Sequence, residues 1–75
     1  MNEYGVEMIP VSSSNVQEIG YDETNQTLYV RFNNSRLYVY QGVPIAEYCG
    51  LRDAGSVGSY LNINIKGNYP YQQLE

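Results

Sequence analysis

The sequence predicts a small α+β domain, in which a three-stranded antiparallel β-meander is covered on one face by two short helices. Two observations lead to this fold class. Apolar and polar residues alternate as in strands through much of the first half of the chain, and apolar residues at helical spacing follow Pro44. A chain of 75 residues has room for one domain.

The first ten residues have no clear period. Pro10 interrupts a short apolar run and removes a backbone hydrogen-bond donor, which limits this segment to an edge strand or an extended arm. We therefore assign residues 1–10 to an N-terminal arm or edge strand, and residues 11–75 to the domain itself. The polar residues 12–15 then form a turn or cap exposed backbone amides.

Residues 16–22 follow as the first strand of the meander. The clearest strand comes next, because Leu28, Val30 and Phe32 alternate with more polar side chains. Residues 33–35, Asn-Asn-Ser, make the following hairpin turn, since asparagine tolerates the left-handed backbone region that such turns require.

The length of that turn decides where Tyr38 and Tyr40 of the third strand point. A two-residue loop would place them beside Tyr29, on a face available for binding. A three-residue loop with a bulge would place them with Leu28 and Val30, in the core. Even in the core, a tyrosine hydroxyl can reach its edge.

Two helices are expected after the third strand. The first covers residues 44–52, with Pro44 as its first helical residue, and the second covers residues 56–66 with Ser56 as its cap. Gly67 and Asn68 stop the second helix, and an extended tail follows. The side chains expected to face the sheet are Ile45, Tyr48, Cys49 and Leu51 in the first helix and Val57, Tyr60, Leu61 and Ile65 in the second.

The charge balance limits the ligands. Four basic against eight acidic residues give a net charge of −4, which opposes binding of a long phosphate backbone, so duplex DNA is not expected as a partner. No apolar run approaches the roughly 20 residues of a membrane span, and no signal-peptide pattern opens the chain. We therefore expect a cytoplasmic protein that has no membrane partner.

Catalytic and metal-binding groups are scarce. The chain has no histidine and a single cysteine, Cys49, so it cannot assemble the ligands of a structural zinc site or an internal disulfide. Cys49 is expected to be a packed apolar residue, and the acidic residues are dispersed along the chain. The sequence predicts a protein that is not an enzyme and needs no cofactor.

Three short motifs in a fixed order resemble the KTSC domain family. The central motif is Tyr38-x-Tyr40 followed by Val43-Pro44. The other two motifs are Ile19-Gly20-Tyr21-Asp22 upstream and Ser56-x-Gly58-x-Tyr60-Leu61-Asn62 downstream. The resemblance covers about residues 11–71. Members of this family occur at the C-terminus of some lysyl-tRNA synthetases and as stand-alone bacterial and phage proteins, and RNA binding has been suggested for them. A glycine often stands in the family where this chain has Ser35, which favours the bulged loop.

A binding site is predicted from tyrosines, cations and the start of the second helix. Tyrosine rings offer faces on which bases stack, and a few cations can hold a phosphate. Ser56 and Gly58 either form an anion-binding helix start or simply cap and pack the helix. The candidate ligand-binding residues are Arg36, Tyr38, Tyr40, Ser56, Gly58, Asn62 and Lys66.

The sequence therefore predicts a non-catalytic binding module for a nucleotide-type ligand. This ligand is a small phosphate-bearing nucleotide signal, sequestered for example by a phage protein that counters bacterial immunity, or a short single-stranded RNA. A homo-oligomer is expected, because one domain of this size can hardly enclose a pocket. The alternative is a protein-protein interaction module with a tyrosine-rich interface and no small ligand.

Overall fold

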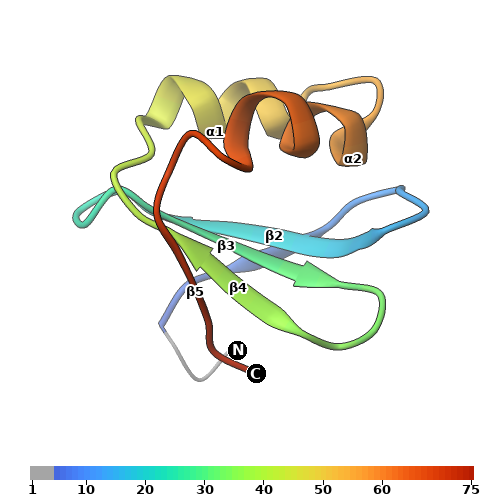
Figure 1. Ribbon diagram of the computed structural model, residues 1–75, viewed down its shortest axis with the longest axis horizontal. Coiled ribbons are helices and arrows are strands. Elements are labelled where there is room, and N and C mark those ends of the chain that lie inside the picture. Colours follow the sequence, from blue (N-terminus) through green and yellow to red (C-terminus); the bar gives the residue numbers. More distant parts are fainter. Residues whose placement is uncertain (1–4) are drawn as a thin grey trace.

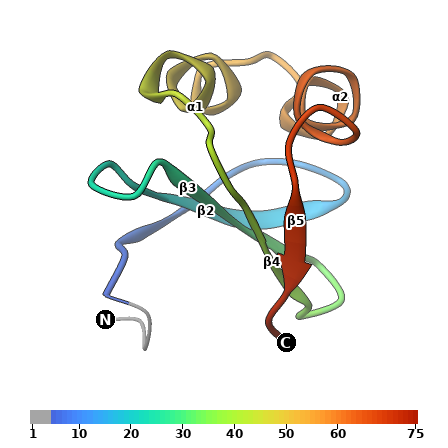
Figure 2. The same ribbon diagram turned by 60° about the vertical axis from the view of Figure 1, so that its left-hand side comes forward.

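A computed structural model describes residues 5–75 of the chain. It contains one five-stranded antiparallel sheet with the strands in sequence order, β1-β2-β3-β4-β5. The strands are β1 (Met8–Pro10), β2 (Val16–Asp22), β3 (Thr27–Phe32), β4 (Leu37–Tyr40) and β5 (Tyr71–Gln73). The helices α1 (Ile45–Arg52) and α2 (Val57–Tyr60) lie over one face of the sheet (Figures 1 and 2).

The predicted α+β class and central meander β2-β3-β4 are confirmed, but the strand number is wrong, since five strands form instead of three. The two additional strands lie at the sheet edges and contain three residues each. A strand of three residues is too short to show an alternating pattern. The prolines next to these strands, Pro10 at the end of β1 and Pro70 before β5, also argue against a strand when the sequence is read alone. The predicted arm or edge strand is an edge strand at β1, and residues 1–4 lie outside the described part.

The β3–β4 turn is the three-residue, bulged alternative. The Phe32 amide donates to the Arg36 carbonyl at 2.9 Å, and Ser35 has a φ of 72°. Val30 consequently pairs with Tyr38. Both tyrosines of β4 therefore lie on the helix-covered face, where Tyr40 is only 2% exposed.

Helix α1 begins one residue later than predicted, because Pro44 is its N-cap in an extended conformation (φ −66°, ψ 153°). Its inner side carries Leu51, which is fully buried, and the partly buried Tyr48. The prediction that Ile45 faces the sheet is wrong, since this side chain is 44% exposed. At the start of the helix, the buried apolar side chain is instead that of Val43, two residues before Ile45, which is fully buried in the core.

The predicted second helix forms, but it changes type midway. Ser56 caps α2, whose last residue leads directly into one π-helical segment, η1 (Leu61–Ile65). The wide turn closes with the Lys66 amide donating to the Leu61 carbonyl at 2.8 Å. Gly67 ends the helix with a φ of 84°, as the sequence predicted. Lys66, the residue before Gly67, is the C-cap of the segment in an extended conformation (φ −64°, ψ 130°).

The core lies between the helices and the sheet. It is formed by Val16, Ile19, Leu28, Val30, Tyr40, Val43, Leu51, Val57, Leu61 and Ile65. Leu37 and Val39 alternate with the two tyrosines of β4 and are buried on the opposite face, at 1% and 5% exposure. No helix in the described part of the chain is long and apolar enough to cross a membrane.

Candidate functional site

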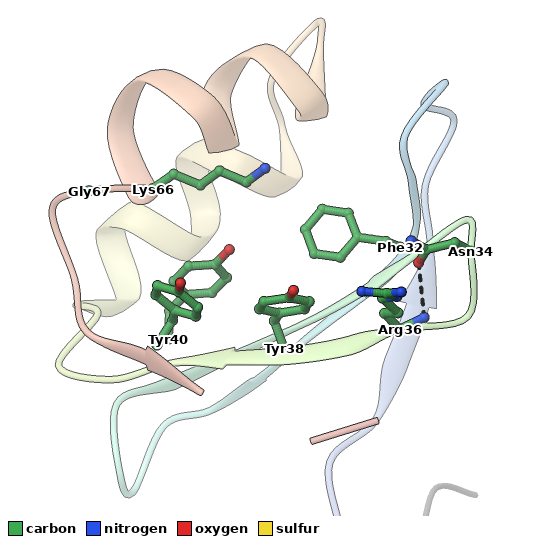
Figure 3. A pocket seen from close by; sticks show the side chains of 8 residues that line it. Phe32, Asn34, Arg36, Tyr38, Tyr40, Lys66 and Gly67 are labelled. Carbon is green, nitrogen blue, oxygen red and sulfur yellow. Dashed lines mark hydrogen bonds between the residues drawn. The ribbon is translucent and has the colours of Figure 1, made fainter. Parts of the chain in front are cut away.

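A cavity opens where the end of the second helix passes over the β3–β4 hairpin. Its volume is about 480 Å³, and we call it the aromatic cavity (Figure 3). It is lined by Phe32, Asn34, Arg36, Tyr38, Tyr40, Lys66, Gly67 and Tyr71. These residues come from β3, β4, β5 and the hairpin and helix ends, so the site exists only once the chain has folded.

The rings of the aromatic cavity form a continuous row. The ring of Phe32 meets that of Tyr38 edge-on at 5.4 Å, and Tyr71 lies 5.7 Å from Tyr38 and 6.0 Å from Tyr40. The row is held by strand pairing, because Tyr40 and Tyr71 are register partners in β4 and β5. Tyr71 is 64% exposed, so its ring is available to a ligand.

The Tyr40 hydroxyl reaches the cavity although its ring is in the core. No hydrogen bond is formed by this hydroxyl within residues 5–75, and no buried side-chain oxygen in that range lacks a partner. The hydroxyl is therefore accessible from the cavity. Burial and the neighbouring Tyr38 and Tyr71 raise the pKa of Tyr40 to about 12, so at neutral pH it is an uncharged donor.

The charge of the aromatic cavity is opposite to that of the whole protein. Arg31 and Arg52 are paired with carboxylates, at 3.0–3.3 Å from Glu18 and Glu75 and 3.1 Å from Asp53 respectively. Arg36 and Lys66 have no carboxylate partner in the described part, and no acidic residue lines the cavity. Arg36 and Lys66, the two basic side chains without a carboxylate partner among residues 5–75, thus line the same cavity.

Lys66 stands above the row of rings. Its Nζ lies 5.2 Å from the ring centroid of Phe32, and Figure 3 shows the side chain extending from the helix end toward that ring. Such cation–π contacts occupy the ammonium only partly and leave its other donors available. Lys66 is therefore placed to meet an anion while it holds the helix end over β3.

A second cavity, of about 360 Å³, adjoins the first. We call it the asparagine cavity, because four asparagines contribute to its wall. It is lined by Ser14, Asn15, Val16, Phe32, Asn33, Asn34, Gly58, Leu61, Asn62 and Lys66. Phe32, Asn34 and Lys66 line both cavities, so the two cavities are neighbours, and we refer to them together as the groove and to each as a compartment.

The four asparagines differ in how much hydrogen-bonding capacity they have left. The Asn33 amide donates to the Ser14 carbonyl at 2.8 Å, and Asn34 Oδ1 accepts from the Arg36 backbone amide at 3.1 Å. The side chains of Asn15 and Asn62 make no hydrogen bond within residues 5–75. Each amide offers donors and an acceptor, as needed to recognise the edge of a base.

Comparison with known proteins gives the family. The sequence model described as "KTSC domain" matches residues 12–69. The chain belongs to the KTSC domain family. In structure, this KTSC domain resembles the crystal structure of a KTSC domain protein from Yersinia pestis, with a TM-score of 0.91, 32% identity and coverage of 95% of this chain and 100% of the other.

Curated relatives of this KTSC domain include both large and small proteins. A lysine–tRNA ligase from Trichormus variabilis is 34% identical over 67 residues, which are 89% of this chain but only 12% of the ligase. A protein from Tsukamurella paurometabola is 36% identical over 62 residues, covering 83% of this chain and 92% of the relative. The family thus includes both a segment of a synthetase and a protein of about the size of the domain.

The structure of this KTSC domain brings together all but one of the residues expected in the site. Arg36, Tyr38, Tyr40 and Lys66 line the aromatic cavity, and Gly58 and Asn62 line the asparagine cavity with Lys66. Ser56 lines neither cavity.

Of the two roles considered for Ser56, the structure shows capping, since its hydroxyl oxygen accepts from the Ser59 amide at 3.3 Å. Gly58 lies against the Ser13–Asn15 loop, where an added Cβ would be at ordinary contact distance, 3.4 Å from Ser13 Oγ and 3.6 Å from Asn15 Nδ2, so packing there does not require glycine.

Sequence reasoning missed several residues of this KTSC domain's groove. The sequence pattern predicts only a strand for Phe32, a turn for Asn34 and Asn15, and an extended tail for Tyr71, whereas all four line the groove. The tail and the turn reach the groove through strand pairing at the sheet edge and loop packing on α2, which no local pattern reveals. The one available signal was the repeated asparagine at positions 33 and 34, beside the candidate Arg36.

Proposed function

We propose that this KTSC domain is a non-catalytic module that binds a small phosphate-bearing nucleotide. The observation that carries the proposal is the aromatic cavity, where a row of rings lies beside the two cations without carboxylate partners. Rings stack on bases of any kind, which contributes about 1–3 kcal/mol per base. Arg36 and Lys66 supply charge-assisted hydrogen bonds for a phosphate.

Charge supports a small ligand over a long nucleic acid. Affinity for a polynucleotide depends on several cations that neutralise successive phosphates. Here the site supplies two cations on a chain of net charge −4. One or two phosphates therefore match the site better than an extended strand, and short single-stranded RNA is the less favoured form of the proposal.

Sequestration is the role that we propose for such a module. Among residues 5–75, the lining of both compartments includes no carboxylate or thiol, and the chain has no histidine. These are the usual groups for general acid-base or nucleophilic work, so the groove is better equipped to hold a ligand than to change it. Binding of a nucleotide signal, as by a phage protein acting against bacterial immunity, is the cellular form of this proposal.

Thermal denaturation with and without nucleotides tests the proposal. The probes are the four ribonucleoside monophosphates and linear and cyclic diadenylate. A bound ligand at about 100 times its Kd stabilises the native state by about 2.7 kcal/mol. For a domain of this size the midpoint then rises by about 10 °C or more.

Matched variants locate the binding. Lys66→Met keeps the length of the side chain and removes the charge, so it should abolish the ligand-induced rise. Arg52→Met removes a cation that is paired with Asp53 and lies outside the groove, and it should keep the rise. Equal rises in both variants, or no rise with any probe in the wild type, would contradict the proposal.

The exposed Tyr71 favours one alternative, a protein-protein interface. It lies on β5, an edge strand that can pair with another chain, and 64% of the residue is exposed. A homo-oligomer, which we also propose, would use this edge to cover the open side of the groove. Native mass spectrometry of undenatured protein reports subunit number and retained small molecules together, and an oligomer without any nucleotide-sized mass favours the interface function.

A further inference from the structure

We propose that the ligand is a two-base nucleotide, with one nucleoside in each compartment of the groove and its phosphodiester beside Lys66. This inference rests on the proposed nucleotide-binding function and specifies its ligand class. The observation behind it is the juxtaposition of two chemically different cavities that share Phe32, Asn34 and Lys66.

The two compartments offer different interactions to a base. The aromatic cavity presents a row of four rings, Phe32, Tyr38, Tyr40 and Tyr71, and therefore binds through stacking. The asparagine cavity has Phe32 as its one aromatic wall, whereas its rim carries the uncommitted amides of Asn15 and Asn62. It therefore binds through hydrogen bonds to a base edge.

The cations are placed where the two compartments meet. Lys66 lines both, and its ammonium lies 5.2 Å from the centre of the Phe32 ring, which is itself part of both walls. Arg36 lines only the aromatic cavity, and its backbone amide donates a hydrogen bond to Asn34 Oδ1. A phosphate at the junction would meet Lys66, and a nucleoside on each side of that phosphate would enter a separate compartment.

Size supports two bases. Pockets for drug-sized ligands occupy about 300–1,000 Å³. Each compartment, at about 480 and 360 Å³, is at the lower end of that range. A mononucleotide stacked in the aromatic cavity would leave the asparagine cavity to water, whereas a two-base ligand uses both.

Isothermal titration calorimetry tests the inference with AMP, linear diadenylate, cyclic diadenylate and hexaadenylate as probes. We expect at least one of the two diadenylates to bind about 100-fold more tightly than AMP, since a second base and its edge contacts are added. Hexaadenylate should bind no more tightly than the better dinucleotide.

Asn62→Ala identifies the compartment. It should weaken dinucleotide binding about tenfold, the size of one lost hydrogen bond, and leave AMP binding unchanged. The matched control is Asn64→Ala, in the same π-helical segment but outside both cavities, which should bind like the wild type.

The outcomes separate this inference from the proposed function. If AMP binds as tightly as both diadenylates, or if Asn62→Ala has no effect on dinucleotide affinity, the two-base ligand is wrong while nucleotide binding stands. If hexaadenylate binds more tightly with a steep salt dependence, the ligand is single-stranded RNA and the small two-base ligand is wrong. If no probe binds, both proposals fail.

Discussion

Two groups of tyrosines lie on the helix-covered side of the sheet, and they differ in what their hydroxyls contact. In the first, which we call the Glu47 cluster, Tyr60 and Tyr69 donate to the two oxygens of Glu47 at 2.7 and 3.2 Å. In the aromatic cavity, the Tyr38 hydroxyl donates to Gln73 Oε1 at 3.2 Å, whereas the hydroxyls of Tyr40 and Tyr71 have no partner in the described part of the chain. The first group is fully satisfied within the domain, and the second is satisfied only at Tyr38.

The Glu47 cluster ties three segments together. Glu47 belongs to α1, Tyr60 to α2, and Tyr69 to the stretch that leads into β5. The pKa of Tyr60 is raised chiefly by its hydrogen bond to Glu47, and the pKa of Tyr69 is raised by burial and by the same carboxylate. Tyrosine is already neutral at pH 7, and the raised pKa values mean that both hydroxyls keep donating to Glu47 to a higher pH than an ordinary tyrosine would.

The comparison shows that tyrosine content alone does not identify a binding face. What separates the two groups is the neighbouring charge. A carboxylate accepts the hydroxyls in the Glu47 cluster, whereas two cations that have no carboxylate partner in the described part of the chain line the aromatic cavity. The first group should therefore affect stability and the second ligand binding. Three measurements, from the largest effect on stability to the smallest, test this division.

Gly50→Ala should disrupt the Glu47 cluster. A Cβ at Gly50 would lie 2.9 Å from Tyr60 Cζ and closer still to the hydroxyl, so the ring must move away from Glu47. We expect a net loss of about 1–2 kcal/mol in unfolding free energy, after a gain in helix propensity of about 1 kcal/mol is taken into account. Nucleotide binding should not change, because Gly50 and Tyr60 line neither cavity.

Gly55→Ala is the control for that variant, measured by urea denaturation alongside it. Gly55 has no atom within 4 Å of an added Cβ and no left-handed φ, so its replacement should change stability by less than about 0.5 kcal/mol. A Gly50→Ala protein that is as stable as Gly55→Ala would show that Tyr60 is not held in this position.

Alkaline pH should destabilise the fold partly through Tyr40. Its pKa rises from an ordinary 10.0 to about 12 in the folded protein, mainly because burial disfavours the phenolate. The stabilisation is complete below the unfolded pKa and is lost as pH rises through the folded one, because the unfolded chain releases the proton first. Stability should therefore fall between pH 10 and about 12.

Tyr40→Phe isolates that contribution. Tyr60 and Tyr69, whose pKa values are also raised, titrate in both proteins and cancel in the comparison. Urea midpoints measured across this pH range should decline less steeply in the variant than in the wild type. Parallel declines would mean that Tyr40 ionises as readily in the folded protein as in the unfolded chain.

The sequence predicted the parts of the fold that local patterns specify. The alternation at Leu28 and Val30 located β3, and Gly67 located the end of the second helix. The direction of the two β4 tyrosines depends on the length of the β3–β4 turn, for which the sequence allowed two values. The positive φ of Ser35, 72°, belongs to the three-residue turn that directs both side chains toward the helices. The π-helical turn before Lys66 has no recognised local signal in this sequence.

The site was predictable only in part, for a related reason. Tyr38, Tyr40 and Arg36 are close in sequence and lie on one strand and its turn, so reasoning from neighbours placed them together. Tyr71 pairs with Tyr40 across more than thirty positions of the chain, through an edge strand too short to recognise. The sequence also could not show which cations are paired with carboxylates, because the pairing depends on tertiary contacts such as that between Arg31 and Glu75.

Tyr71→Ala should have the smallest effect on stability and a clear effect on binding. The side chain is largely exposed, so its removal should cost less than about 0.5 kcal/mol. Loss of one stacking ring should nevertheless weaken nucleotide binding by about 5- to 100-fold. The control is Ile63→Ala, another exposed apolar residue (73%) that lines neither cavity and should leave affinity unchanged. If Tyr71→Ala instead binds nucleotide like the wild type but changes subunit number, the exposed ring belongs to an interface between chains, and the unsatisfied tyrosines serve a protein partner.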